Sequence, residues 1–187
     1  MTEAMQVGAF VAQLAAKQPT PGGGAAACVA AAIGNAAGAM ACAYSQRKKD
    51  VESGAAAVAA ETGSRLLAAG PRELSAADED AAAYGALQAT WAKDCALSNE
   101  AKAAVAAHAL AVPVGLVERC HEHALLLKTF FPSCNPGIVS DAHVGANRAD
   151  ERPASCANED KRPDTTPVPR EGPSKSPVST ARAMPTA

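Results

Sequence analysis

An acidic stretch in an alanine-rich segment holds the side chains best placed for proton transfer. Asp80 and Tyr84 are four residues apart, so on a helix they share one face. Asp78 and Asp80 are two residues apart and cannot both face the same site. Because burial on an apolar helical wall raises the pKa of a carboxyl, such a group can take and return protons near neutral pH. The pattern favours Asp80 as a general acid/base, with a solvated acidic helix face as the alternative interpretation.

A glycine corner is the second element that could do chemistry, and it reads Pro19-Thr20-Pro21-Gly22-Gly23-Gly24. The prolines make the entry stiff and extended, and the glycines permit close approach of other groups. A long helix is expected to follow, and its free N–H groups and positive dipole end would attract an anion. The corner is neither a Walker loop nor a dinucleotide-binding fingerprint. A plain loop before a buried helix is the alternative.

Two further polar clusters flank predicted helices. Lys48 and Lys49 close the long uncharged stretch, where cations suit a helix C-terminus and could also attract an anionic substrate tail. Asn135 precedes Ser140 and Asp141, and either of the latter two could cap a last helix or lie in its first turn. Both clusters therefore have a structural interpretation beside a functional one.

The cysteines and histidines do not predict a metal site. Six cysteines are present without a Cys-x-x-Cys pair, and several lie in apolar helical runs, so we expect reduced thiols in a cytoplasmic protein. The run Cys120-His121-Glu122-His123 places its ligands one or two residues apart, and such positions do not face each other on a helix.

Composition predicts close-packed helices. The 187 residues are 48% hydrophobic, but much of this is alanine and only 3% are aromatic. Alanine is the best helix former and a poor strand former. The net charge of -2 argues against nucleic-acid binding, and no secretory signal is expected. We predict an all-α, up-and-down bundle of about five to six helices.

The predicted helices follow from apolar spacing and from breakers. The uncharged second helix is long enough for a membrane span, but it is mostly alanine and glycine, so we expect a buried helix of a soluble protein. Gly70-Pro71 predicts a stop, whereas Pro113 predicts a kink within a longer helix. The expected helices begin after a capping Thr2 with a stripe of Val7, Phe10, Val11 and Leu14, and continue over 24–44, 51–69, 72–93 and 100–131.

The C-terminal segment 148–187 has no Leu, Ile or aromatic residue and is rich in Pro, Ser, Thr and charge. Such a segment cannot bury enough apolar surface to offset its chain entropy. We therefore predict a helical domain over 1–147 and a disordered tail over 148–187.

Four motifs, in this order, resemble the cyclodeaminase/cyclohydrolase family: Pro19–Ala27 at the glycine corner, Asp78–Tyr84, the Ala111–Val114 kink and Cys134–Ala142. The resemblance covers roughly residues 5–147, and the family's last long helix is missing. It implies a folate substrate, a homodimer, and no metal or redox cofactor.

The resemblance also implies roles and three alternative functions. Asp80 would be the acid/base and Asp141 would orient water or the pterin, while Pro21, Gly22, Gly23, Gly24, Lys48, Lys49, Tyr84, Asn135 and Ser140 would bind substrate. The first alternative is hydrolysis of 5,10-methenyltetrahydrofolate to 10-formyltetrahydrofolate, which we favour because the chain shows no formimidoyl-transferase segment. The second is a formimidoyltetrahydrofolate cyclodeaminase that releases ammonia. The third is an inactive, truncated paralogue that forms a dimeric helical module.

Overall fold

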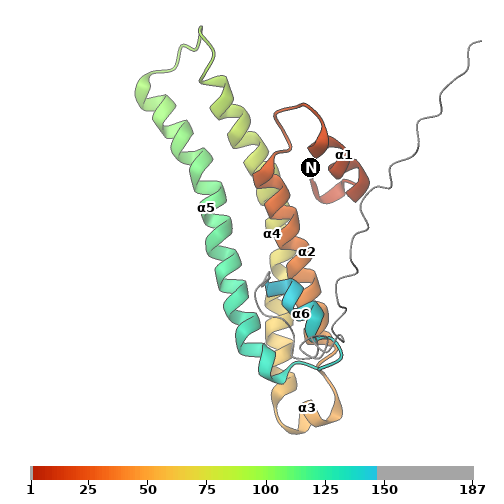
Figure 1. Ribbon diagram of the computed structural model, residues 1–187. Coiled ribbons are helices and arrows are strands. Elements are labelled where there is room, and N and C mark those ends of the chain that lie inside the picture. Colours follow the sequence, from red (N-terminus) through yellow and green to blue (C-terminus); the bar gives the residue numbers. More distant parts are fainter. Residues whose placement is uncertain (1, 147–187) are drawn as a thin grey trace, which may run out of the picture. The chain divides into compact units, whose positions relative to one another are not determined.

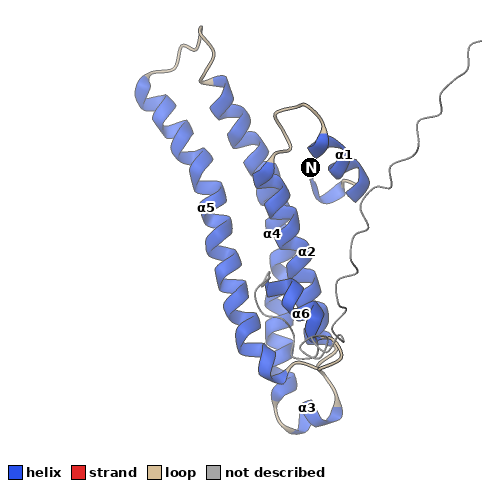
Figure 2. Cartoon of the chain, in the orientation of Figure 1, coloured by secondary structure: helices blue, strands red, loops and turns tan. Residues whose placement is uncertain are grey.

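The computed structural model describes residues 2–146, which form six α-helices and two short 3-10 turns, with no strand in that range (Figures 1 and 2). The predicted all-α bundle is confirmed. The predicted tail, 148–187, lies outside the described residues. The elements in order are η1 (Thr2–Ala4), α1 (Val7–Ala15), α2 (Gly23–Ala43), α3 (Lys48–Glu52), α4 (Ala55–Ala89), α5 (Asn99–Phe130), η2 (Phe131–Ser133) and α6 (Val139–Ala146).

Three long antiparallel helices position the rest of the domain (Figure 1). α4 packs against both α2 and α5, whereas α2 and α5 touch each other little. The end of the bundle where α2 begins is called the upper end here, and the end where α2 stops is called the lower end. Two apolar clusters fill the interior, one around Leu66, Leu127 and Phe130 and one around Phe10 and Leu116.

Small residues on α2 let the backbone of α6 approach closely. A Cβ atom on Gly145 would lie 2.8 Å from the carbonyl oxygen of Gly34 and 2.9 Å from the Cα of Gly38. The Gly34-x-x-x-Gly38 spacing therefore serves helix–helix packing within the chain. α2 is not covered on every side, because Ile33 is 55% exposed.

α4 is a single helix that continues through Pro71, so the predicted stop at Gly70-Pro71 is wrong. Proline removes one ladder hydrogen bond, here the one to the carbonyl of Leu67. Leu67 is 68% exposed, so water can satisfy that carbonyl. Because α4 packs along both α2 and α5, it stays one continuous helix, although helix propensity alone predicts two helices that are separated at Pro71.

The basic cluster does not end α2, which also corrects the prediction. α2 ends at Ala43, and Lys48 and Lys49 lie in the separate helix α3. Gly54 follows α3 with φ of 78°, a left-handed conformation that favours glycine and separates α3 from α4.

The remaining helix boundaries agree with the sequence except at the N-terminus. α5 spans Pro113, and Ser98 caps it by accepting the Ala101 N–H at 3.2 Å. Thr2 does not cap a helix, because its N–H and hydroxyl donate to Asp78 instead. In α1 only Phe10 of the predicted stripe is buried.

Two segments among the described residues are long and apolar enough to cross a membrane by length and composition, namely α2 and Asn99–Ser133. α2 lies along α4 and α6, as the core helix of a bundle does. The second segment, which holds α5, keeps most of its apolar window exposed.

Candidate functional site

The upper end of the bundle brings together two predicted site elements that are far apart in sequence. The Asp80 carboxylate from α4 lies directly against Gly24 in the first turn of α2. A Cβ atom on Gly24 would overlap that carboxylate, so only glycine leaves room for it. The glycine corner therefore creates a place for Asp80, which is half-buried there.

The first backbone N–H groups of α2 have no partner within the helix. The first intrahelical bond of α2 runs from the Ala26 N–H to the Gly22 carbonyl at 3.0 Å, and no side chain caps the helix. The N–H groups of Gly23, Gly24 and Ala25 thus have no acceptor within α2. Together with the helix dipole they favour negative charge at this end, from Asp80 or from a ligand. Pro21, which follows a cis peptide bond, leads into this turn.

The other residues of the acidic stretch face elsewhere. Asp78 accepts the Thr2 N–H at 2.9 Å and the Thr2 hydroxyl at 2.7 Å, so it holds η1 against α4. Tyr84 is exposed and stacks edge-on against Trp91, with ring centroids 6.4 Å apart. As the two-residue spacing predicts, only one of the two aspartates, Asp80, reaches the glycine corner.

A buried ion pair below Asp80 was not found from the sequence. Glu73 of α4 is fully buried and accepts three hydrogen bonds from Arg119 of α5, at 2.9, 3.1 and 2.9 Å. Glu73 and Asp80 are seven residues apart and lie on one side of α4. Cys28 of α2 lies near both, and burial, followed by the charges of Asp80 and Glu73, raises the pKa of its thiol to about 11. The sequence does contain one indication of this arrangement, since Glu73 and Asp80 are seven residues apart in an apolar helix and so share one face.

The lower end is a closed polar network. Arg47 donates to both oxygens of Asp50, at 2.6 and 2.9 Å, and to the Asn135 side chain at 3.0 Å. Asn135 also donates from its amide to the Tyr44 carbonyl, and its backbone N–H donates to the Ser45 hydroxyl. Hydrogen bonds from Arg47 lower the pKa of the Asp50 carboxyl. These groups join the end of α2 to η2, so the Asn135 side chain is already used by the fold.

The other predicted substrate-binding residues of this end are more exposed. Lys48 lies in solvent, 3.8 Å from Glu52, and Lys49 is also exposed. On α6, the exposed Ser140 hydroxyl donates to the half-buried Asp141 at 3.3 Å. Their roles in binding remain predictions.

The predicted residues therefore form two groups rather than one site. α2 has 21 residues, which places its two ends about 30 Å apart. The glycine corner, Asp80 and Tyr84 lie at the upper end, and Lys48, Lys49, Asn135, Ser140 and Asp141 lie at the lower end. One chain does not bring Asp80 and Asp141 together.

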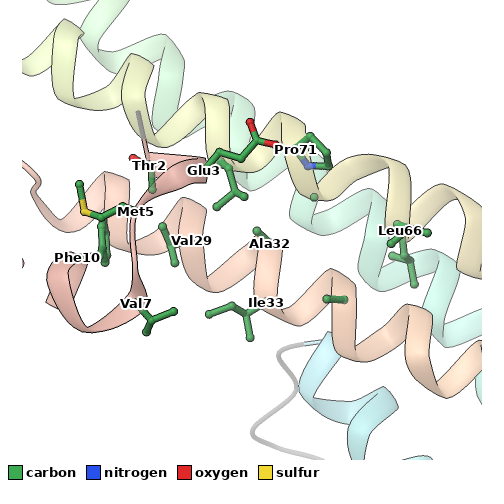
Figure 3. A pocket seen from close by; sticks show the side chains of 14 residues that line it. Thr2, Glu3, Met5, Val7, Phe10, Val29, Ala32, Ile33, Leu66 and Pro71 are labelled. Atoms are coloured by element: carbon green, nitrogen blue, oxygen red, sulfur yellow. The ribbon is translucent and has the colours of Figure 1, made fainter.

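An apolar pocket lies elsewhere in the described part of the chain. Its volume is about 550 Å³, and it lies between the N-terminal segment, α2 and α4 (Figure 3). Met5, Phe10, Val29, Ile33 and Leu66 form its walls, and none of the predicted site residues lines it. With Glu3 as its one ionisable lining residue, this pocket offers little for proton transfer, so we assign the candidate site to the upper end.

The fold and the contact between Gly24 and Asp80 define an all-α domain whose glycine-rich helix start adjoins an acidic neighbouring helix. The family model described as formiminotransferase-cyclodeaminase matches residues 6–155, so the chain belongs to that family. This confirms the resemblance in the motifs and extends it past residue 147. The chain is thus a folate-related member of a family of folate-metabolising enzymes.

A crystal structure of formiminotetrahydrofolate cyclodeaminase from Thermotoga maritima has a similar fold, with a TM-score of 0.68 and 21% sequence identity. The similarity covers 79% of this chain and 72% of that one. At this identity it establishes the fold. No curated protein matches the chain.

Proposed function

We propose that the chain is a formimidoyltetrahydrofolate cyclodeaminase, which closes 5-formimidoyltetrahydrofolate to 5,10-methenyltetrahydrofolate and releases ammonia. The observation that carries the proposal is the Asp80 carboxylate that lies against Gly24 in the first turn of α2, a turn whose backbone N–H groups have no partner within the helix. The family description and the similar structure both refer to a cyclodeaminase, and they favour this reaction over the hydrolysis that the sequence suggested first.

Asp80 can carry the proton transfers that the reaction needs. N10 of the substrate attacks the carbon of the formimidoyl group, which reacts as its protonated cation and so already carries two hydrogens on its terminal nitrogen, and the N10 proton passes to the Asp80 carboxylate. The tetrahedral carbon then bears N5, N10 and an amino group. Protonated Asp80 returns its proton to that amino nitrogen, the carbon–nitrogen bond breaks, and ammonia leaves with the bonding electrons. The ionised carboxylate that remains lies beside the cationic methenyl product and stabilises it.

A homodimer is part of the proposal, because the two groups of predicted residues lie about 30 Å apart in one chain. An antiparallel partner would place the lower end of one chain beside the upper end of the other. The partner's Asp141 and the partner's Ser140 would then complete the site around Asp80.

The outer face of α5 is the surface we propose for this contact. Leu110 and Val117 are 65% and 68% exposed on it, and it faces away from α4. Its residues follow the alternating four- and three-residue spacing of a coiled-coil seam: Ala103, Ala107, Leu110, Val114, Val117 and His121. Because α5 runs the height of the bundle, an antiparallel α5 pair brings opposite ends together.

The test offers the purified chain both folate substrates and follows ammonia together with the near-ultraviolet absorbance of the methenyl compound. A cyclodeaminase forms methenyl product and ammonia in equal amounts from the formimidoyl substrate. A cyclohydrolase instead consumes methenyl substrate faster than the uncatalysed reaction. Background rates with both substrates from a well-folded chain would leave the inactive helical module as the interpretation.

A further inference from the structure

The seam between α4 and α5 contains a polar hollow that the proposed chemistry does not use. Its volume is about 300 Å³, and it lies on the side of α4 away from the apolar pocket. Its ionisable lining residues are Arg65, Arg72 and Glu73 from α4 and Arg119, Glu122 and His123 from α5.

The charges in the seam do not cancel. Glu73 and Arg119 neutralise each other through their buried ion pair. Burial lowers the pKa of His123, so its imidazole is neutral at physiological pH. Arg65 and Arg72 form no ion pair with any residue in 2–146, and Glu122 is the one carboxylate that opposes them. The seam therefore keeps an excess of positive charge.

The distance between Arg65 and Arg72 indicates which kind of anion the seam would bind. Arg65 and Arg72 are seven residues apart, so they share one face of α4 and their Cα atoms lie about 10 Å apart along the helix. Each guanidinium is a planar fork that matches one carboxylate. Two separate forks fit a ligand with two carboxylates better than a single phosphate.

The seam also leads toward Asp80. Arg119 lines a second hollow of about 160 Å³ next to the first, together with Glu79 and His108. Because Glu79 is seven residues beyond Arg72, this second hollow lies nearer the upper end. An elongated ligand with its acidic end between the arginines would thus extend along α4 in the direction of Asp80.

We propose that the α4–α5 seam binds a dicarboxylate of the glutamyl type, with Arg65 and Arg72 each taking one carboxylate and Glu122 accepting from the ligand's amide N–H. The link to catalysis rests on the proposed function, since a folate ends in a glutamyl group, but the binding site itself does not. The seam then replaces Lys48 and Lys49 as the place for the anionic end of the substrate.

The experiment measures binding of N-(4-aminobenzoyl)-L-glutamate to the full chain by titration calorimetry or by NMR shifts. We expect Arg65→Gln with Arg72→Gln to weaken binding at least about tenfold, because two charge-assisted contacts are lost. Lys102→Gln with Lys128→Gln, which removes two cations outside the seam, should change affinity by less than about twofold. Both arginines are exposed, so circular dichroism should show the same helicity in all variants. The probe's affinity should also drop when its glutamate is removed to leave 4-aminobenzoate.

Three results would contradict the proposal that the seam binds a dicarboxylate. One is unchanged affinity in the double-arginine variant, another is an equal loss in the Lys102 and Lys128 variant, and the third is a tenfold loss in Lys48→Gln with Lys49→Gln alone. The probe has no formimidoyl group, so its binding does not depend on turnover. A chain that binds the probe through the arginines but releases no ammonia supports the binding site in the seam and contradicts the proposed deaminase activity. A chain that releases ammonia with the same KM in the parent and in the arginine variant supports the deaminase activity and contradicts the binding site.

Discussion

The two ends of α2 carry motif residues of the same kind but use them differently. At the lower end, Arg47, Asp50 and Asn135 bond to one another and to the backbone. At the upper end, Asp80 has no hydrogen bond or ion pair with another residue in 2–146, and it lies against Gly24 in the first turn of α2, where the backbone N–H groups have no partner within the helix. The lower end is satisfied by the fold, whereas the upper end still has polar groups available for a ligand. A sequence motif alone therefore does not tell whether its polar residues stabilise the fold or are available to bind a ligand.

The largest effect that would sharpen this comparison is expected from Asp80→Asn. Removing the proton-transfer group should lower the rate of ammonia release by about 100-fold or more. Helicity and melting temperature should stay the same, since Asp80 bonds to no described residue. Asp94→Asn, which changes an exposed aspartate in the loop after α4, is the matched control and should stay within about twofold of the parent. Equal rates in the parent and Asp80→Asn would remove Asp80 from the chemistry.

A change at the lower end should act on stability instead. Asn135→Ala removes the hydrogen-bond partner of Arg47 Nη1 and of the Tyr44 carbonyl, which should cost about 1–3 kcal/mol of the free energy of unfolding. Urea denaturation measures this loss. The rate per folded molecule should change little if the Asn135 side chain serves only the fold. A large drop in rate with unchanged stability would make Asn135 a substrate-binding residue and break the contrast.

Two adjacent glycines at the upper end provide a matched pair of substitutions. Gly24→Ala places a methyl group where the Asp80 carboxylate lies, so the carboxylate must move and the rate should fall about tenfold. Gly23→Ala meets no atom within 4 Å and should keep the parent rate. Steady-state ammonia release compares the two, with melting curves to check folding. If both variants behave alike, the contact between Gly24 and Asp80 has no part in catalysis.

The smallest expected effect is a pH dependence at the lower end. Hydrogen bonds from Arg47 hold the pKa of the Asp50 carboxyl below its ordinary value of 3.8. The stabilisation is therefore complete above that ordinary value and is lost as the pH falls through the lower, folded-state value. The melting temperatures of the parent and Asp50→Asn should differ at about pH 6 and converge toward about pH 2. A gap that stays constant on acidification would contradict the assignment.

Most of the fold could be predicted because its signals are local. The alanine-rich composition, the Ser98 cap and the apolar spacing around Pro113 each specify a helix without reference to the rest of the chain. The continuation of α4 through Pro71 could not be predicted, since packing against two neighbours overrides the local breaker. The separate helix α3 has a local signal that the sequence reading missed, because the Asp50 carboxylate accepts from the Arg47 backbone N–H three residues earlier, at 2.9 Å.

The candidate site was predictable only in part. Asp80 was identified from its motif, and its contact with Gly24 joins segments that are 56 residues apart in sequence. The partner of Glu73 could not be identified, because several cations are available and helix pairing decides which one meets it. The 30 Å separation of the two groups also depends on the direction of each helix, which periodicity does not specify.

The close packing of α6 on α2 has a consequence for amide hydrogen exchange. Around Gly34 and Gly38 the α2 backbone is covered by α4 and by the backbone of α6, so these amides should become accessible mainly when the whole domain opens. The outer face of α5 has no such cover among the described residues, and its amides should exchange through smaller local openings. Exchange followed by mass spectrometry should therefore rank the middle of α2 slowest, and added protection along α5 at high protein concentration would mark that helix as the contact between two chains.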